Sequence, residues 1–301
     1  MQSELNGNIL KCLLKGKNGK VQLNELELHP LFANISLGNE DGWLTYRVSR
    51  EENAILMQQL YPAYAGASKT IHIDEGVILS IDTPKYNRVL KKTQAVLAGY
   101  KLPEVRVHLG YDATNYRGSR FDGFVATTDK PQIAMGMLDI FEAFALKHSG
   151  SKDAWLLYLE NDARPINVER SENMKVLLNV PEDAELIRPF VGKNQKYVAE
   201  KATYQYDWGG GLAHAFYISA AGCQKVVAYA LKYKWKYVCD IDIYKLAKRC
   251  PGYPSGFDGW SFRATNGVNA ISSVLEEDEK IRMYGLSENI FDQASNPLTY
   301  I

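Results

Sequence analysis

The stretch Trp155-Leu156-Leu157-Tyr158-Leu159-Glu160-Asn161-Asp162 decides the fold of this chain, because its first five residues form the most apolar strand-like run in the sequence. A short, continuous apolar run is typical of a strand that is buried on both faces. The run ends in two acidic residues that flank one asparagine. We therefore expect a central strand that delivers Glu160 and Asp162 to one edge of a sheet.

Two strands and a helix are predicted upstream of this stretch. Residues 77–81 form another short apolar run, and Pro84 opens a helical pattern that continues over residues 86–98 and stops at Gly99. Residues 105–109 form a second strand, so this segment is a β-α-β unit, the signature of a parallel sheet.

The alternation of strands and helices continues along the chain. Residues 131–147 are predicted to form a long helix. A glycine-rich turn at residues 209–211 precedes a predicted strand at 215–218 and a predicted helix at about 220–233. Cys239-Asp240-Ile241-Asp242 then leads into another predicted helix, and a strand is expected at 281–284. The pattern predicts an α/β domain over residues 76–301.

The first 75 residues are predicted to form a small β-rich unit. Asn18-Gly19 lies between the apolar run of residues 9–14 and an alternating run that begins at Val21, which predicts a β-hairpin. Residues 43–48 indicate another strand, and residues 51–61 have helical spacing. No catalytic constellation is visible in this part of the sequence.

Composition narrows the class of protein. Of the 301 residues, 46% are hydrophobic and 23% are charged, so a sizeable core can be buried. Lys plus Arg equals Asp plus Glu at 35 each, and this balance argues against a general attraction to nucleic acid or anionic membranes. The four cysteines form no Cys-x-x-Cys pair, which indicates free thiols in a reducing compartment. With neither a signal-peptide pattern nor a transmembrane-length apolar stretch, we expect a soluble, cytoplasmic protein.

Glu160 and Asp162 indicate the chemistry of the chain. Ligands in open α/β sheets bind beyond the carboxyl ends of strands, and two carboxylates one residue apart on an extended exit point to the same side. They can share a hard divalent cation such as Mn²⁺ or Mg²⁺, which would neutralise a diphosphate. Asp162 is the expected direct ligand, whereas Glu160 binds either the metal through water or a ribose hydroxyl. The alternative is that both acids cap a turn shaped by Pro165.

Several short segments between residues 76 and 301 carry a family resemblance. They are, in chain order, residues 78–82 with Arg88, 110–113, 157–163, 210–219 with Gly222 and Lys225, 238–240, and 285–287 followed by Gln293 and Ser295. In this order they resemble the motifs of glycosyltransferase family 25, the lipooligosaccharide and procollagen galactosyltransferase group of the GT-A superfamily. Residues 157–163 resemble the Leu-Glu-Asp-Asp motif of that family, with Asn161 where the family usually has Asp.

The resemblance implies a GT-A-like domain, with a Rossmann-type mixed sheet and flanking helices, that transfers a sugar from a nucleotide-sugar donor. A uridine diphosphate sugar is the expected donor, and a glycan or glycoprotein hydroxyl is the expected acceptor. Besides the two acids, the donor site would include Ser80, Asp82, Arg88 and Asp112. Residues 1–75 have no counterpart in the family, and would either extend the acceptor cleft or mediate self-association.

The family inverts the anomeric carbon, which requires a general base on the face opposite the leaving diphosphate. Asp240 is the candidate base, with Asp242 close behind it and Asp207 as a further candidate. Asp240 fits equally well as the N-cap of a helix that starts near Ile243, and for Asp242 the capping role is favoured.

Three candidates for contacts with the acceptor lie in or near the glycine-rich turn: Trp208, Gly210 and His214. Trp208 either stacks on a sugar ring or belongs to the core. For His214, a structural and hydrogen-bonded role is favoured over contact with the metal or the acceptor.

Two other functions fit the same residues. A retaining glycosyltransferase would use the same donor site without an opposite-face base. A carbohydrate-binding protein on a degenerate transferase fold would bind sugar without turnover. A metal-dependent phosphohydrolase fits less well, because such enzymes cluster more His and Asp ligands than this sequence does.

Overall fold

The computed structural model describes the following parts of the 301-residue chain: residues 2–7, 9–28, 30–47, 49, 52, 64–112, 116–125, 131–151, 153–165, 173–189, 204–206, 214–235, 243, 246–248, 257–258, 263–264, 275–286 and 290–293. Contacts between Cα atoms divide the chain into two compact units. The smaller unit combines Met1–Pro62 with Arg249–Glu276, and the larger unit combines Ala63–Lys248 with Glu277–Ile301. The sequence placed a boundary between residues 75 and 76, whereas these contacts group residues 63–75 with the larger unit.

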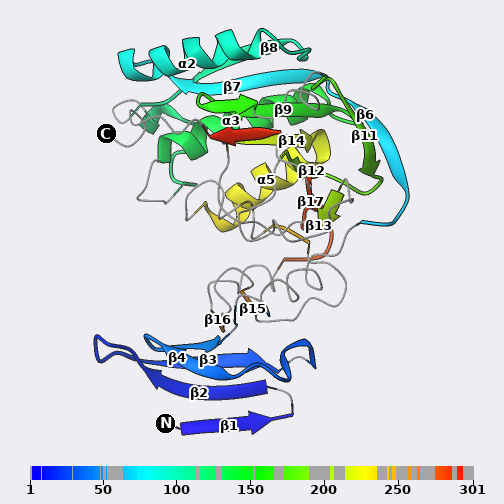
Figure 1. The fold of residues 1–301 in the computed structure, drawn as a ribbon. Helices are drawn as coiled ribbons and strands as arrows, with labels where there is room; N and C mark the ends of the chain where they lie inside the picture. Colours follow the sequence, from blue (N-terminus) through cyan, green and yellow to red (C-terminus); the bar gives the residue numbers. More distant parts are fainter. Residues whose placement is uncertain are drawn as a thin grey trace. The chain divides into compact units, whose positions relative to one another are not determined.

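The larger unit is a mixed α/β fold built on one main sheet (Figure 1). Its described strands, in spatial order, are β13 (Tyr204–Tyr206), β17 (Met283–Leu286), β12 (Leu186–Arg188), β14 (Ala215–Ser219), β9 (Trp155–Glu160), β7 (Glu75–Ile81) and β8 (Val105–Gly110). β7 runs parallel to both β8 and β9, as the predicted β-α-β unit requires. β14 runs antiparallel to β9 and to β12, which makes the sheet mixed.

Helices cover both faces of this sheet. The described helices of the unit are α2 (Pro84–Leu97), α3 (Pro131–Lys147), α5 (Ala220–Tyr233) and the short 3₁₀ helix η2 (Tyr116–Gly118). Side chains of β7 alternate between the faces: Ile78 joins a cluster with Leu90 of α2, whereas Leu79 lies against Gly136 of α3. α3 and α5 pack against each other on the face opposite α2 (Figure 1). The bounds of α3 and α5 agree with those predicted, because long periodic patterns are strong local signals.

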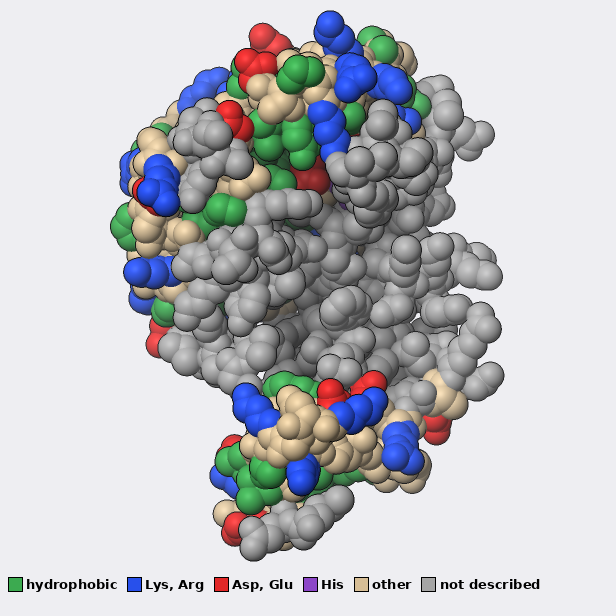
Figure 2. All heavy atoms as spheres, turned by 90° about the vertical axis from the view of Figure 1, so that its left-hand side faces the viewer, with side chains coloured by type: hydrophobic (Ala, Val, Ile, Leu, Met, Phe, Trp, Pro, Cys, Tyr) green, Lys and Arg blue, Asp and Glu red, His purple; other side chains and the backbone are tan. Residues whose placement is uncertain are grey.

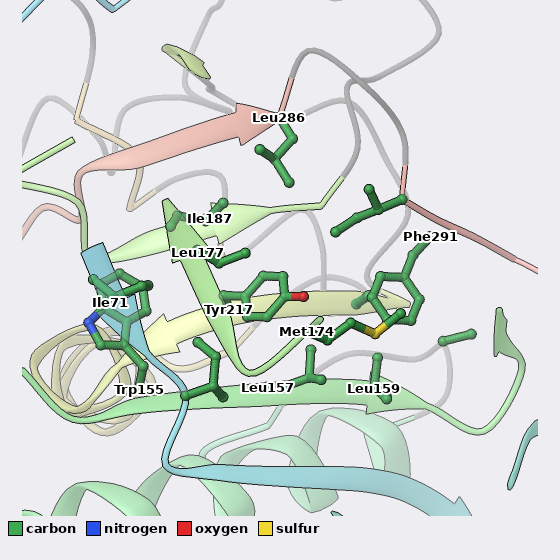
Figure 3. Close-up of a cluster of buried hydrophobic side chains, with 14 of the residues drawn as sticks. Ile71, Trp155, Leu157, Leu159, Met174, Leu177, Ile187, Tyr217, Leu286 and Phe291 are labelled. Carbon is green, nitrogen blue, oxygen red and sulfur yellow. The ribbon is translucent and has the colours of Figure 1, made fainter. Parts of the chain in front are cut away.

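The centre of the sheet is β9, whose residues 155–159 are all buried. Trp155, Leu157 and Leu159 point to the α2 side and join the large apolar cluster of Figure 3. Tyr217 of β14 lies above them in the same cluster and reaches toward Phe291 (Figure 3). Full burial of one such side chain contributes roughly 1.5–3 kcal/mol, so this cluster fixes the position of β9 in the sheet.

Two further pairs of strands surround this cluster. β6 (Ser68–His72) pairs antiparallel with β11 (Val176–Pro181), and β10 (Ala163–Pro165) pairs antiparallel with β18 (Phe291–Gln293). β6 leads directly into β7, and Ile71 of β6 packs into the cluster. These contacts are the reason that residues 63–75 group with the larger unit.

The smaller unit contains two antiparallel sheets in its described part. One comprises β1 (Gln2–Asn6), β2 (Ile9–Lys15) and β3 (Val21–Glu27), and the other β4 (Leu37–Glu40), β5 (Trp43–Tyr46), β16 (Arg263–Ala264) and β15 (Phe257–Asp258), with the 3₁₀ helix η1 (Pro30–Phe32) between β3 and β4 in the chain. β2 and β3 form the predicted hairpin, and Gly19 takes a φ of 78° in its turn. The Asn18 side chain accepts a 2.9 Å hydrogen bond from the Lys20 N–H, which stabilises that turn.

Of the remaining predictions, some agree with the structure and others concern residues that the structure does not describe. The strand expected at residues 281–284 is found as β17, shifted by two residues. Cys12 and Cys223 are buried free thiols, as expected. Three predicted segments lie outside the described residues: the helix at 51–61, of which only Glu52 is described, the glycine-rich turn at 209–211, and the segment 238–242.

Two glycines allow α3 to pack closely on β7 and β8. A Cβ atom at Gly136 would lie 2.8 Å from Cδ1 of Leu79 and 3.5 Å from Cα of Gly110. We expect Gly136→Ala to lower the free energy of unfolding by about 1–3 kcal/mol, because either the buried Leu79 side chain or the helix has to shift. Gly118→Ala is the control, since a Cβ there meets nothing within 4 Å and should change stability by less than about 0.5 kcal/mol. Denaturant unfolding measures both, and a Gly136→Ala protein as stable as the wild type would contradict this packing.

Candidate active site

A pocket lies at the edge of the sheet where the three parallel strands β7, β8 and β9 end. It is lined by Leu79, Ser80, Ile81, Lys85, Tyr86, Val89, Gly110, Gln132, Ile133, Glu160, Asn161 and Asp162. Figure 2 looks toward this side and shows an acidic side chain set back in a hollow, with Lys and Arg side chains beside it. The pocket has a volume of about 110 Å³, which is room for several waters or for a hydrated cation.

The acidic segment lines this pocket because the chain turns directly after β9. The N–H of Glu160 donates a 2.8 Å hydrogen bond to the carbonyl of His214, which holds the end of β9 to the start of β14. The carbonyl of Asn161 accepts a 2.6 Å hydrogen bond from the Thr93 hydroxyl of α2. Asp162 is only 5% exposed, so its carboxyl group is held in the wall of the pocket.

The side chain of Asn161 differs in role from its two acidic neighbours. Its Nδ2 lies 3.5 Å from Oγ of Ser80, a buried residue of β7, so it makes a long hydrogen bond between the ends of adjacent strands. An ionised aspartate has no proton to donate there and would add a third negative charge beside Glu160 and Asp162. Asn161 therefore orients the turn that carries the two acids.

The first turn of α2 forms another wall of the pocket. Thr83 caps the helix, since its hydroxyl accepts a hydrogen bond of 3.4 Å from the N–H of Tyr86, and Pro84 occupies the first turn. Helix N-termini carry a partial positive charge, and no acidic residue lies in this first turn. Lys85 lines the pocket at this helix end, and Tyr86 adds an aromatic ring. The pocket thus combines two carboxylates with a positively charged helix terminus.

The predicted donor-site residues divide into two groups. Those that line the pocket are Ser80, Glu160 and Asp162. Asp82 is exposed and accepts a 2.9 Å hydrogen bond from the Asn87 side chain, outside the pocket lining. Arg88 is also exposed, and its Nε donates to the carbonyl of Pro84 at 3.2 Å. Asp112 is half-buried just after β8 and is likewise not among the lining residues.

Five of the predicted base and acceptor residues lie outside the described residues, so their roles stay predictions. They are Asp207, Trp208, Gly210, Asp240 and Asp242. His214 is described and is 1% exposed. Its main-chain carbonyl accepts a hydrogen bond from the N–H of Glu160. This contact does not involve the imidazole, so the role of the His214 side chain stays a prediction.

A polar cluster anchors the segment that follows β8 next to the pocket. The Tyr111 hydroxyl is hydrogen-bonded to Ser119 and to Asp139 of α3, and burial raises the pKa of this hydroxyl. Burial also raises the pKa of Asp139, against the opposing effects of the Tyr111 hydrogen bond and of the charges on His108 and Arg120. The chain that leaves β8 is therefore tied to α3, which keeps the pocket edge in place.

The chemistry of the acids fits a hard divalent cation. Glu160 and Asp162 supply carboxylate oxygens, and Mg²⁺ is commonly bound through one or two carboxylates together with phosphates and water. No group of three or more His, Cys, Asp or Glu side chains suited to a metal is found in the described part of the chain. Two carboxylates are a donor set that can hold a cation together with an anionic ligand and water.

Sequence reasoning missed Lys85, Tyr86 and Gln132, which line the pocket from the first turns of α2 and α3. A signal was available, because a proline marks the start of each helix and such first turns lie at the ligand-binding edge of an α/β sheet. Thr93 gave no comparable signal. Its hydroxyl bonds the carbonyl of Asn161, which is 68 residues further along the chain, and no local pattern reports such a contact.

Comparison of the sequence with protein-family models and with curated proteins finds no match. Among the helices that the structure describes, none has the length and apolar character needed to cross a membrane. The pocket itself is therefore the basis for assigning a function.

The bond between Thr93 and Asn161 can be tested by two substitutions. Thr93→Val removes the hydroxyl but keeps the shape of the buried side chain, and we expect a loss of about 1–2 kcal/mol in unfolding free energy. Amide hydrogen exchange over residues 160–163 should also accelerate, because the turn loses an anchor. Thr93→Ser keeps the hydroxyl and should retain exchange near the wild-type rate. Equal exchange in both variants would show that this bond does not hold the turn.

Proposed function

We propose that this chain is a metal-dependent glycosyltransferase that moves a sugar from a nucleotide diphosphate sugar, with a uridine diphosphate sugar as the expected donor, to a hydroxyl group of a glycan or glycoprotein. The observation that carries this proposal is the pocket at the ends of β7, β8 and β9, where Glu160 and Asp162 lie with the N-terminus of α2. A mixed sheet whose parallel strands end at such a pocket is compatible with a GT-A-like domain built on the larger unit, Ala63–Lys248 with Glu277–Ile301.

A nucleotide diphosphate matches the charges of this pocket. The positive end of α2 and the Lys85 ammonium attract a diphosphate, and a divalent cation held by Asp162 would link that diphosphate to the acids. Glu160 binds either the cation through a water molecule or a ribose hydroxyl of the nucleotide. Tyr86 offers a ring on which a nucleobase can stack.

Transfer requires the bond between sugar and phosphate to break as an acceptor hydroxyl attacks the anomeric carbon. A bound Mn²⁺ or Mg²⁺ would stabilise the negative charge of the departing diphosphate. Lys85 and the α2 N-terminus stabilise the same charge from the protein side. In the inverting reaction, one carboxylate accepts the proton of the acceptor hydroxyl, and Asp240 is the proposed base, with Asp242 and Asp207 as alternatives. Trp208 and Gly210 are the proposed acceptor contacts.

The role of Asp162 is tested by Asp162→Asn, which keeps the size of the side chain but removes its charge. We expect uridine diphosphate to bind at least about tenfold more weakly in the presence of Mn²⁺, and transfer to fall by about 100-fold or more. Glu104→Gln is the control, because Glu104 is an exposed acid at the other end of β8. Thermal shift and calorimetry with a panel of nucleotide sugars make the measurement. The proposal fails if no nucleotide binds the wild type with Mn²⁺, or if Asp162→Asn binds as the wild type does.

The role of Lys85 is tested against Lys91, which lies on the same helix but is exposed outside the pocket. Lys85→Ala should weaken the binding of uridine diphosphate by about tenfold, because a charge-assisted hydrogen bond is lost. Lys91→Ala should bind as the wild type. The difference should shrink at high ionic strength, since salt screens the charge. Titration calorimetry at low and high salt decides, and equal affinities of the two variants would remove Lys85 from the diphosphate site.

A further inference from the structure

Exposed apolar side chains are concentrated in the first sheet of the smaller unit. Nine large hydrophobic residues are exposed in the described part of the chain, and five of them lie between residues 5 and 23. They are Leu5, Ile9, Leu13, Val21 and Leu23, with exposed fractions of 40–60%. Such a concentration differs from the scattered exposed apolar residues of ordinary surfaces and indicates an interaction site.

The pairing of β2 with β3 gathers four of these residues on one face. Burial alternates along β2, and Leu13 pairs with Leu23 while Lys15 pairs with Val21. The same face carries a cross-strand ion pair of 3.0 Å between Lys11 and Glu25. We call this the outer face and define it by Ile9, Lys11, Leu13, Val21, Leu23 and Glu25.

The other face of the sheet is already covered within the smaller unit. Cys12, Leu14 and Leu26 are buried there. The Asn24 side chain donates to the carbonyl of Gly42 at 2.9 Å and accepts from the N–H of Leu44 at 2.8 Å, which joins this face to the β4–β5 hairpin. The sheet therefore has one satisfied face and one open, partly apolar face.

Charge is distributed unevenly along the strands of the outer face. The hairpin end carries Lys15, Lys17 and Lys20, all exposed. Two acids, Glu40 and Asp41, lie near this end, and Oδ1 of Asp41 accepts a 2.6 Å hydrogen bond from the N–H of Lys17. Toward the other end of the strands, Glu4 and Glu25 are the register partners of Lys11 on either side. The apolar residues Leu13 and Leu23 lie between the basic and acidic ends.

We propose that the outer face is the interface between two copies of this chain, stacked face to face with their strands antiparallel. The two-fold axis lies between the sheets and perpendicular to the strands, so the basic end of each copy covers the acidic end of the other. Leu13 and Leu23 of both copies then meet at the centre, at the spacing of about 10 Å that packed sheets adopt.

The arrangement of charge favours a second copy over other partners. An anionic membrane or a nucleic acid presents one sign of charge and would repel Glu4 and Glu25. A second copy with its strands antiparallel places its acidic end over the basic end of the first copy, and its basic end over the acidic end. Pairing through the edge strand β1 is disfavoured, because an antiparallel pairing centred on Glu4 places two like charges opposite each other.

The first test is the oligomeric state of the full chain, measured by sedimentation velocity over a range of concentrations. We expect a dimer whose dissociation constant rises by at least about tenfold in Leu13→Thr/Leu23→Thr, because threonine suits a strand but lacks the apolar area. Leu178→Thr on β11, an exposed strand leucine of the larger unit, is the control and should leave the dimer intact. A wild type that stays monomeric, or a dimer that survives the double substitution, overturns the proposal.

The second test exchanges charges and checks the antiparallel geometry. Two double variants are compared, Lys15→Glu/Lys20→Glu and Glu4→Lys/Glu25→Lys. Each should weaken self-association, because the altered end of one copy then faces an end of the same charge in the other copy. An equal mixture of the two variants should form a mixed dimer, because each reversed end meets its complement. Circular dichroism establishes that both variants fold, and if either does not, the leucine substitutions decide. Folded variants that fail to associate when mixed contradict the antiparallel arrangement.

Discussion

Burial of β9 on both faces is the constraint on which the larger unit depends. Five consecutive side chains from Trp155 to Leu159 are removed from water, so the strand has to run through the middle of the sheet with α2 on one side and α3 on the other. An unpaired carboxylate within such an interior carries a large desolvation cost. The chain turns at Asn161 and Asp162, directly after β9 ends at Glu160, and the place where the apolar run stops is also the place where the pocket forms.

The directions of the neighbouring strands determine what else reaches this edge. Because β7 and β8 run parallel to β9, they end at the same edge, and the helices that follow them begin there. The N-terminus of α2, with Lys85, is thereby brought to the two acids. β14 runs the other way and begins at this edge, so the carbonyl of His214 is in place to hold Glu160. The opposite charges of the pocket are thus a consequence of sheet topology.

Sequence patterns predicted the elements whose signal is local. The apolar run of β9, the periodic helix Pro131–Lys147 and the hairpin around Asn18-Gly19 all agree with the structure. The pairing of β6 with β11, and of β12 with both β14 and β17, depends on contacts between distant segments that no local pattern encodes. The same distinction holds at the pocket. Glu160 and Asp162 could be found because they follow the strongest strand, whereas the exposed positions of Asp82 and Arg88 depend on how the first turn of α2 bends after β7.

The smaller unit has a consequence for how the chain folds. Its second sheet joins β5, near the start of the chain, to β16, near its end, through the pairing of Thr45 with Arg263. On a ribosome the early strands emerge long before their partner, so β5 waits with an open edge while Ala63–Lys248 of the larger unit is synthesised. Completion of this sheet is therefore a late event, and the hairpin of β2 and β3, which needs only neighbouring residues, can serve as the template on which the late strands assemble.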